Sequence, residues 1–272
     1  MRDSICPGSI DGAAGSQTRN AFVAFQQKYA LATTGTLDKD TRAMLQLREA
    51  PIATYIVTEA DVARLRPWPK GWEAKSKLDH LDYSTVLELV AEKSCTHPKQ
   101  IIRLNPQIAD WEHVAAGTVV ALPRVARTQP ATRPARILIR LSEKTMQLYD
   151  SESRLLAHFP CSIARRVEKR PVGRIEVVTS AANPNYTFNP ANFPDSEEAQ
   201  AIGRKLILQP GPNNPVGVAW ISLSLPGYGI HGSPEPEKIG RTESAGCFRL
   251  SNWNAEYLQP LVYPGLPIDV EP

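Results

Sequence analysis

The stretch from Ile137 to Phe159 places the tightest limit on what this chain can fold into. Three short runs of apolar and β-branched residues, 137–141, 145–149 and 155–159, follow one another there, and polar turns separate them. Runs of this length and composition favour β-strands, and such short connections join antiparallel neighbours. The pattern therefore predicts a meander, and the similar texture further on predicts a β-rich domain over residues 137–272.

The first fifty residues carry a helical pattern instead. Ala21, Phe22, Phe25 and Tyr29 recur at the spacing of one helix face. Asp38 stands where the N-cap of a second short helix is expected. Residues 1–50 are therefore expected to form a small helical bundle whose aromatic side chains belong to the core.

Residues 53–124 alternate strand and helix signals. The segments 54–58 and 117–123 are rich in β-branched residues and are predicted strands. Between them, Ser84 is placed to cap one helix, and Pro98 suits the first turn of another. The expected order is a βααβ unit.

A linker is predicted over residues 125–136. This segment is rich in arginine, contains two prolines and has no acidic residue. Proline keeps such a segment extended and semi-rigid. The chain is therefore expected to be a multidomain α+β protein in which the two upstream units act as tethers and do not build the site of the third.

Composition excludes several classes of protein. Of the 272 residues, 42% are apolar and 22% are charged, as in ordinary globular chains. The formal net charge of +3 is too small to indicate a nucleic-acid partner, and no stretch approaches the roughly twenty apolar residues of a membrane helix. Residues 1–6 lack the apolar core of a signal peptide.

The reactive chemistry is predicted near the C-terminus, where Gly246 and Cys247 follow His231 by one loop. A cysteine attacks a carbonyl as thiolate, and a free thiol with a pKa near ~8.5 is mostly protonated at neutral pH. A neighbouring imidazole can remove that proton and return it to the leaving group. Gly246 would let backbone amides approach a developing oxyanion. This chemistry requires no metal and no organic cofactor.

The surrounding residues resemble the signature of the L,D-transpeptidases, bacterial enzymes that remodel peptidoglycan stem peptides. The resemblance is carried by His-Gly-Ser at 231–233, Ile-Gly-Arg at 239–241 and Ser-Ala-Gly-Cys-Phe-Arg-Leu-Ser-Asn at 244–252. It implies that Cys247 is the nucleophile and His231 the general base. It also implies supporting roles for Gly232, Ser233, Ser244, Gly246, Arg249 and Asn252. Many members carry a second histidine where this chain has Ala245.

The resemblance also implies a reaction. Cys247 would attack the amide between the third-position diamino acid and the D-alanine of a tetrapeptide stem, and D-alanine would leave. An acceptor amine would resolve the thioester, forming a crosslink or attaching a protein to the wall. A carbapenem should acylate the same thiol. Such an enzyme works in the periplasm or cell envelope, so the export segment is expected to have been trimmed from this chain.

Two further resemblances concern the upstream units. Residues 1–50 resemble a peptidoglycan-binding domain, and 53–124 resemble a LysM module, a type that binds N-acetylglucosamine chains. The segment 64–81 is an insertion, and its Trp68 and Trp72 could stack on sugars or cap the module's core. Tetrapeptide stems and glycan strands are thus the expected partners, and 181–217 is expected to be a long loop over the cleft.

Several alternatives remain open at this stage. Water as the acceptor would make the enzyme an L,D-carboxypeptidase, and the catalytic fold of a wall-anchoring protein could be inactive. An intracellular cysteine peptidase is a third option. If Cys247 stays a free thiol, at most one disulfide can form among Cys6, Cys95 and Cys161.

Overall fold

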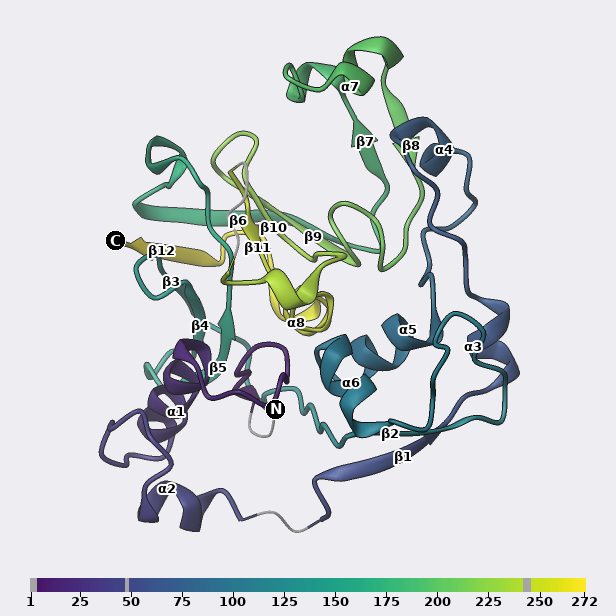
Figure 1. Ribbon diagram of the computed structural model, residues 1–272. Coiled ribbons are helices and arrows are strands. Elements are labelled where there is room, and N and C mark those ends of the chain that lie inside the picture. The colour runs from purple at the N-terminus through teal and green to yellow at the C-terminus, as the bar shows by residue number, and fades with distance from the viewer. Residues whose placement is uncertain (1–3, 47–48, 242–245) are drawn as a thin grey trace.

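A mixed eight-stranded sheet forms the centre of the C-terminal unit, residues 136–271, in the computed structural model, which describes residues 4–46, 49–241 and 246–272 (Figure 1). The strand order is β11-β10-β9-β6-β12-β3-β4-β5. The strands of this sheet are β3 (Arg136–Arg140), β4 (Thr145–Tyr149), β5 (Leu155–Pro160), β6 (Gly173–Ala182), β9 (Ala219–Leu223), β10 (Gly229–His231), β11 (Phe248–Arg249) and β12 (Pro267–Glu271).

The predicted meander is confirmed, because β3, β4 and β5 pair antiparallel in sequence order. The parallel strand β12 continues the sheet beyond β3. Ile137, Ile139, Met146 and Leu148 are fully buried and belong to the main core of this unit. Burial of such side chains contributes roughly 1.5–3 kcal/mol each, so this core fixes the sheet that carries β10 and β11.

The N-terminal unit, residues 4–46, consists of α1 (Ser16–Lys28) and α2 (Lys39–Met44). The N-cap prediction is confirmed, since the Asp38 side chain accepts a hydrogen bond from the Thr41 amide. Ala21, Ala24 and Phe25 are buried against Leu155 of β5. The helix stripe is core, as expected, but part of that core is shared with the C-terminal unit.

Gln26 is the polar centre of the N-terminal unit. Its side chain is fully buried, and Nε2 donates to Thr41 Oγ1 at 2.8 Å and to the Thr36 carbonyl at 3.0 Å. Oε1 accepts from the Gly35 amide at 2.9 Å. One side chain therefore links α1 to the loop before α2.

Gln26→Leu should destabilise the protein by about 2–3 kcal/mol, because it leaves buried donors and acceptors without partners. Urea denaturation of the full-length protein measures this as a lower midpoint. The matched control is Gln27→Leu at the exposed neighbouring position, which should change stability by less than about 0.5 kcal/mol. Equal midpoints for the two variants would contradict this role.

The middle unit, residues 52–123, has the expected βααβ core. Strands β1 (Ile52–Ile56) and β2 (Val119–Pro123) pair antiparallel, and α5 (Val86–Lys93) and α6 (Pro98–Leu104) lie between them in sequence. A further helix, α3 (Glu59–Ala63), follows β1 ahead of the insertion, and the insertion itself contains α4 (Trp72–Ser76). Pro98 begins α6 as predicted.

The predicted cap of α5 is wrong by one residue. The N-cap is Thr85, whose side chain accepts from the Glu88 amide. The Ser84 hydroxyl and amide instead donate to the Glu88 carboxylate. Both serine and threonine are good N-caps. Thr85 takes this position because the Ser84 hydroxyl is already bonded to the Glu88 carboxylate.

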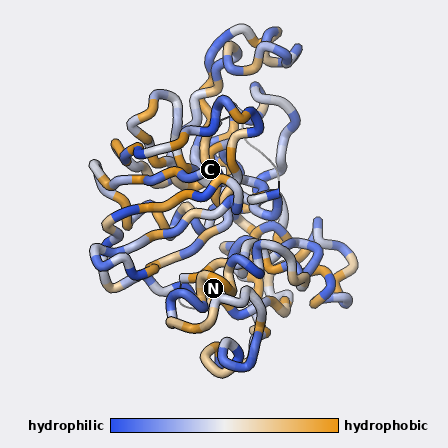
Figure 2. Tube along the Cα trace, turned by 90° about the vertical axis from the view of Figure 1, so that its left-hand side faces the viewer, coloured by the Kyte–Doolittle hydropathy of each residue, from blue (hydrophilic) through white to orange (hydrophobic). Residues whose placement is uncertain are grey.

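The prediction of a long loop over residues 181–217 is also wrong. Residues 186–208 form an arm that contains β7 (Tyr186–Phe188), α7 (Glu197–Ile202) and β8 (Leu206–Leu208). The two strands pair antiparallel. Figures 1 and 2 show the arm projecting from the body at the end away from the N-terminus.

The middle unit holds this arm. Trp72 of α4 stacks on Phe188 at 4.6 Å between ring centroids and contacts Phe193 at 5.4 Å. The Trp72 amide donates to Glu198, and Arg204 pairs with Glu73. Trp72 therefore packs in an aromatic cluster shared by both units.

Residues 124–135 contain no helix or strand and connect β2 to β3, but side chains of this segment are held by the C-terminal unit. Arg127 donates to the Trp253 carbonyl at 3.0 Å, and the Tyr257 hydroxyl donates to the Thr128 carbonyl at 3.0 Å. Both partners belong to α8 (Asn252–Leu258), which packs on β9 and β10. The expectation of loosely tethered upstream units is therefore wrong, because the three units pack together.

None of the four cysteines forms a disulfide in this structure. Cys6, Cys95 and Cys161 are buried free thiols, and Cys247 is a partly buried one. Within the described ranges, no helix is both long enough and apolar enough to cross a membrane.

Candidate active site

The pairing of β10 with β11 brings His231 and Cys247 close together. The two strands run parallel, with Ile230 opposite Phe248 and His231 opposite Arg249. Ile230 and Phe248 both point into the core, and because side chains alternate along a strand, His231 points to the opposite face. Cys247 directly precedes β11, and its thiol forms a hydrogen bond with the backbone of Gly229, two residues before His231.

The ring of His231 is held in one tautomer. Its Nδ1 lies 2.6 Å from the carbonyl oxygen of Gly232. A carbonyl only accepts, so Nδ1 carries the proton and Nε2 presents a lone pair. The indole of Trp220, directly opposite on β9, stacks on the imidazole with 5.6 Å between ring centroids.

Burial keeps both reactive groups neutral at rest. It lowers the pKa of His231 to about 4, against a raising effect from the Gly232 hydrogen bond and with a further lowering effect from the positive charge of Arg249. Burial also raises the pKa of the Cys247 thiol, and a hydrogen bond with the Gly229 backbone opposes that shift. The Sγ atom donates to the Gly227 carbonyl at 3.7 Å. The resting pair is therefore imidazole and thiol.

Asn252 fixes the turn that follows His231. Its Oδ1 accepts from the amides of Ser233 and Val218, and its Nδ2 donates to the Pro212 carbonyl. A Cβ on Gly232 would lie 2.3 Å from Oδ1. Glycine at 232 is therefore required by this close approach.

Gly217 faces the same constraint. Its φ is +63°, and a Cβ there would lie 2.0 Å from Oδ1 of Asn252. Gly217→Ala should therefore lower kcat/KM by about 10–100-fold, because a small shift of a positioned base has effects of that size. The assay compares it with Gly265→Ala, which also has positive φ but an open Cβ position away from the site. Equal losses in both would trace the effect to backbone strain.

The remaining predicted residues have separate surroundings. The Ser233 hydroxyl accepts from the Glu235 amide, so it braces the turn. Burial lowers the pKa of Arg249, and the charge of Glu235 opposes this shift. A Cβ on Gly246 would meet no described heavy atom within 4 Å. Ser244, like Ala245, lies outside the described residues.

The N-terminal unit holds the loop between the two reactive residues. Gln17 donates to the Ile239 carbonyl at 2.7 Å, and Arg241 pairs with Asp11 at 2.6 Å. This loop connects His231 to Cys247, so its anchoring affects both. The sequence offered no signal for these contacts, which join positions more than 220 residues apart.

Tyr186 and Trp220 were missed by sequence reasoning. Tyr186 of the arm lies near enough to Cys247 that the thiolate's charge helps to raise the tyrosine's pKa, although burial is the larger cause. Trp72 lies behind it at 6.3 Å between ring centroids. An isolated tyrosine in an Asn- and Pro-rich segment carries no distinguishing pattern, whereas Trp220 could have been sought on the strand before His231.

Comparison with known proteins identifies the class that this fold and site belong to. The chain belongs to the family described as the L,D-transpeptidase catalytic domain, which matches residues 134–270. A peptidoglycan binding domain matches residues 3–45, which confirms the interpretation of the N-terminal unit. Both domain descriptions therefore point to peptidoglycan as the substrate.

Named relatives are L,D-transpeptidases. The YkuD protein of Bacillus licheniformis, an L,D-transpeptidase by name, is 27% identical over 68% of this chain and 93% of its own. The YkuD protein of Bacillus subtilis is 24% identical over 62% of this chain and 84% of its own.

Two solved structures are also similar. L,D-transpeptidase 3 of Mycobacterium tuberculosis has a TM-score of 0.40 at 17% identity, over 59% of this chain and 77% of that one. An L,D-transpeptidase from Mycobacterium smegmatis has a TM-score of 0.38 at 20% identity, over 50% of this chain and 58% of that one.

Proposed function

We propose that this L,D-transpeptidase uses Cys247 and His231 to transfer a peptidoglycan stem peptide through a thioester. The observation that carries the proposal is that Cys247 lies against the backbone of β10, the strand that ends at His231, whose Nε2 is the available base. The donor is a tetrapeptide stem, and D-alanine is the leaving group.

The neutral resting pair indicates how the proton moves. Nε2 of His231 accepts the thiol proton as Sγ of Cys247 attacks the carbonyl carbon, because a thiol with a raised pKa supplies little thiolate beforehand. The C–N bond then breaks, and the imidazolium returns the proton to the departing amino group of D-alanine. An acceptor amine then attacks the thioester carbonyl while Nε2 of His231 takes its proton. The C–S bond breaks, and the proton returns to Sγ of Cys247.

The charge of Arg249 supports substrate binding in this proposal. The guanidinium is partly buried beside the imidazole and lowers its pKa, so it lies within reach of a substrate carboxylate. No heavy atom of the described residues lies within 4 Å of a Cβ at Gly246, which supports room for the developing oxyanion beside Cys247. Ser244 is proposed as a supporting residue on its sequence position alone.

The upstream units are proposed to bind the cell wall and so bring the enzyme to its substrate. The βααβ order of the middle unit supports a LysM-like module, with boundaries at 53–124, between a peptidoglycan-binding unit over 1–50 and a catalytic domain over 137–272. Such an enzyme works in the periplasm or cell envelope. Glycan strands and tetrapeptide stems are the proposed partners, and a wall-attached protein is a further candidate acceptor.

Product analysis tests the reaction and its nearest alternative. Disaccharide-tetrapeptide is incubated with the full-length protein, and mass spectrometry follows free D-alanine and muropeptide dimers. Transpeptidation predicts both products, whereas an L,D-carboxypeptidase would release D-alanine and leave only tripeptide. Release of neither product would contradict the proposed function.

The acid limb of the pH profile of kcat/KM should lie at low pH. His231 accepts a proton only when neutral, and its pKa of about 4 keeps it neutral above that pH. Activity should therefore fall only as pH drops through about 4, rather than through the ordinary value near ~6.5. A stability check at each pH separates titration from unfolding. An inflection near ~6.5 would contradict a buried, neutral base.

A further inference from the structure

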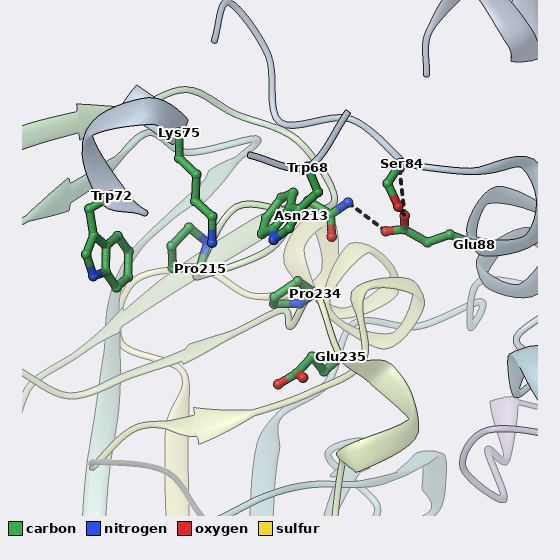
Figure 3. A pocket seen from close by; sticks show the side chains of 9 residues that line it. All are labelled: Trp68, Trp72, Lys75, Ser84, Glu88, Asn213, Pro215, Pro234 and Glu235. Carbon is green, nitrogen blue, oxygen red and sulfur yellow. Dashed lines mark hydrogen bonds between the residues drawn. The ribbon is translucent and has the colours of Figure 1, made fainter. Parts of the chain in front are cut away.

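A pocket lies at the junction of the middle unit and the C-terminal unit. Its volume is about 490 Å³, within the usual range for a small-ligand site. Figure 3 shows the side chains that converge on it from both units. Those used below are Trp68, Trp72, Lys75, Glu88, Asn213 and Glu235.

The carboxylates of the pocket are already engaged. Glu88 accepts from Asn213 Nδ2 at 2.6 Å and from the amide and hydroxyl of Ser84. Glu235 pairs with Lys238. Because Glu88 spends its acceptors on neutral donors of the protein and Glu235 is paired with a lysine, neither carboxylate calls for a charged ligand, and the pocket is suited to one that is polar but uncharged.

The aromatic side chains differ in what they leave available. Trp72 is committed to the arm through its stack on Phe188. The Trp68 side chain remains 40% exposed, and the Lys75 ammonium lies 4.2 Å from its ring centroid. Because the ammonium lies over one face of the indole, a ligand ring would stack on the other face, and the ammonium would donate hydrogen bonds to its polar groups.

The pocket is continuous with the active-site turn. Its wall includes Pro234, three residues after His231, so their Cα atoms are at most about 11 Å apart. A second groove of about 290 Å³ shares Ser84, Glu88 and Pro234 with the pocket and extends along α5. A ligand that occupied both would run along the junction of the two units.

We propose that this junction pocket is a subsite for one N-acetylated sugar ring of the glycan strand that carries the donor stem. The inference rests on the proposed function, in which the stem enters the adjacent site. A pyranose ring is uncharged, has an apolar C–H face for Trp68, and has hydroxyl and acetamido groups that can accept from Lys75 and donate to Oδ1 of Asn213. The middle unit would thereby select stems that are still attached to glycan.

Binding is tested first, on the full-length protein, by titration calorimetry with chitotetraose, the soluble tetramer of N-acetylglucosamine. Trp68→Ala should weaken binding by about tenfold, since it removes an aromatic contact. The matched control is Ile56→Ala, which removes an exposed apolar side chain elsewhere on the middle unit and should leave binding unchanged. Equal affinity in Trp68→Ala and wild type would overturn the subsite.

Kinetics then separate the subsite from the reaction. The wild type should have a KM about tenfold lower for disaccharide-tetrapeptide than for the free tetrapeptide, and Trp68→Ala should bring the two values together with little change in kcat. Equal KM values in the wild type would overturn the subsite while leaving the reaction intact. If neither substrate released D-alanine, the proposed reaction would fail, and the calorimetry would still decide the sugar site.

Discussion

Cys247→Ala should lower the release of D-alanine from a tetrapeptide stem by at least about 1,000-fold, as loss of a nucleophile does in comparable enzymes. The substitution removes one sulfur atom at a partly buried position, so the melting temperature should change little. A discontinuous assay of D-alanine, with substrate above KM, measures the effect.

The matched control for this variant is Cys161→Ala. Cys161 is a core thiol with no exposed surface, and burial raises its pKa, so a substrate cannot reach it in the folded protein. That variant should lose some stability but keep its activity per folded molecule. Near-normal turnover by Cys247→Ala would refute the mechanism.

The second large effect concerns the middle unit. Trp72→Ala should lower kcat/KM for a small free tetrapeptide by about 10–100-fold, although Trp72 belongs to a different unit from Cys247. The substitution leaves a cavity against Phe188 and Phe193, at a typical cost of about 3–5 kcal/mol. Loss of that contact releases the arm and, with it, Tyr186 beside the thiol.

The control is Ile207→Ala, at an exposed position of β8 on the same arm, which should retain activity.

By the same reasoning, a chain beginning near Pro134 should lose most of its activity on free tetrapeptide, against the sequence-based expectation that the upstream units do not build the site. Full activity in both Trp72→Ala and the shortened chain would restore the picture of simple tethers.

The sequence predicted those features that depend on neighbouring residues. The meander from Ile137 to Phe159 is set by short apolar runs between polar turns. The starts of α2, after Asp38, and of α6, at Pro98, are set by capping chemistry. The Gly-Cys and His-Gly motifs could be found because they are compact in sequence. Strand pairing then accounts for how two motifs separated by thirteen residues, 233–245, come together.

The features that were missed depend on contacts between distant parts of the chain. The strands of the arm have only three residues each, and their stability depends on Trp72, more than a hundred positions away. The choice of Thr85 over Ser84 depends on how the Glu88 carboxylate is engaged, and that carboxylate also accepts from Asn213, more than a hundred positions away. The ion pair of Asp11 with Arg241 likewise joins opposite ends of the chain. No local pattern encodes such contacts.

Intact-protein mass spectrometry after exposure to a carbapenem tests the central claim most directly. The strained carbonyl of the carbapenem should be attacked by Sγ of Cys247, and opening of the lactam ring expels no fragment. We expect one adduct with the full mass of the carbapenem, mapped to the peptide that contains Cys247 and absent from Cys247→Ala. An adduct on Cys6, Cys95 or Cys161, or one that persists in Cys247→Ala, would contradict the assignment of Cys247 as the nucleophile.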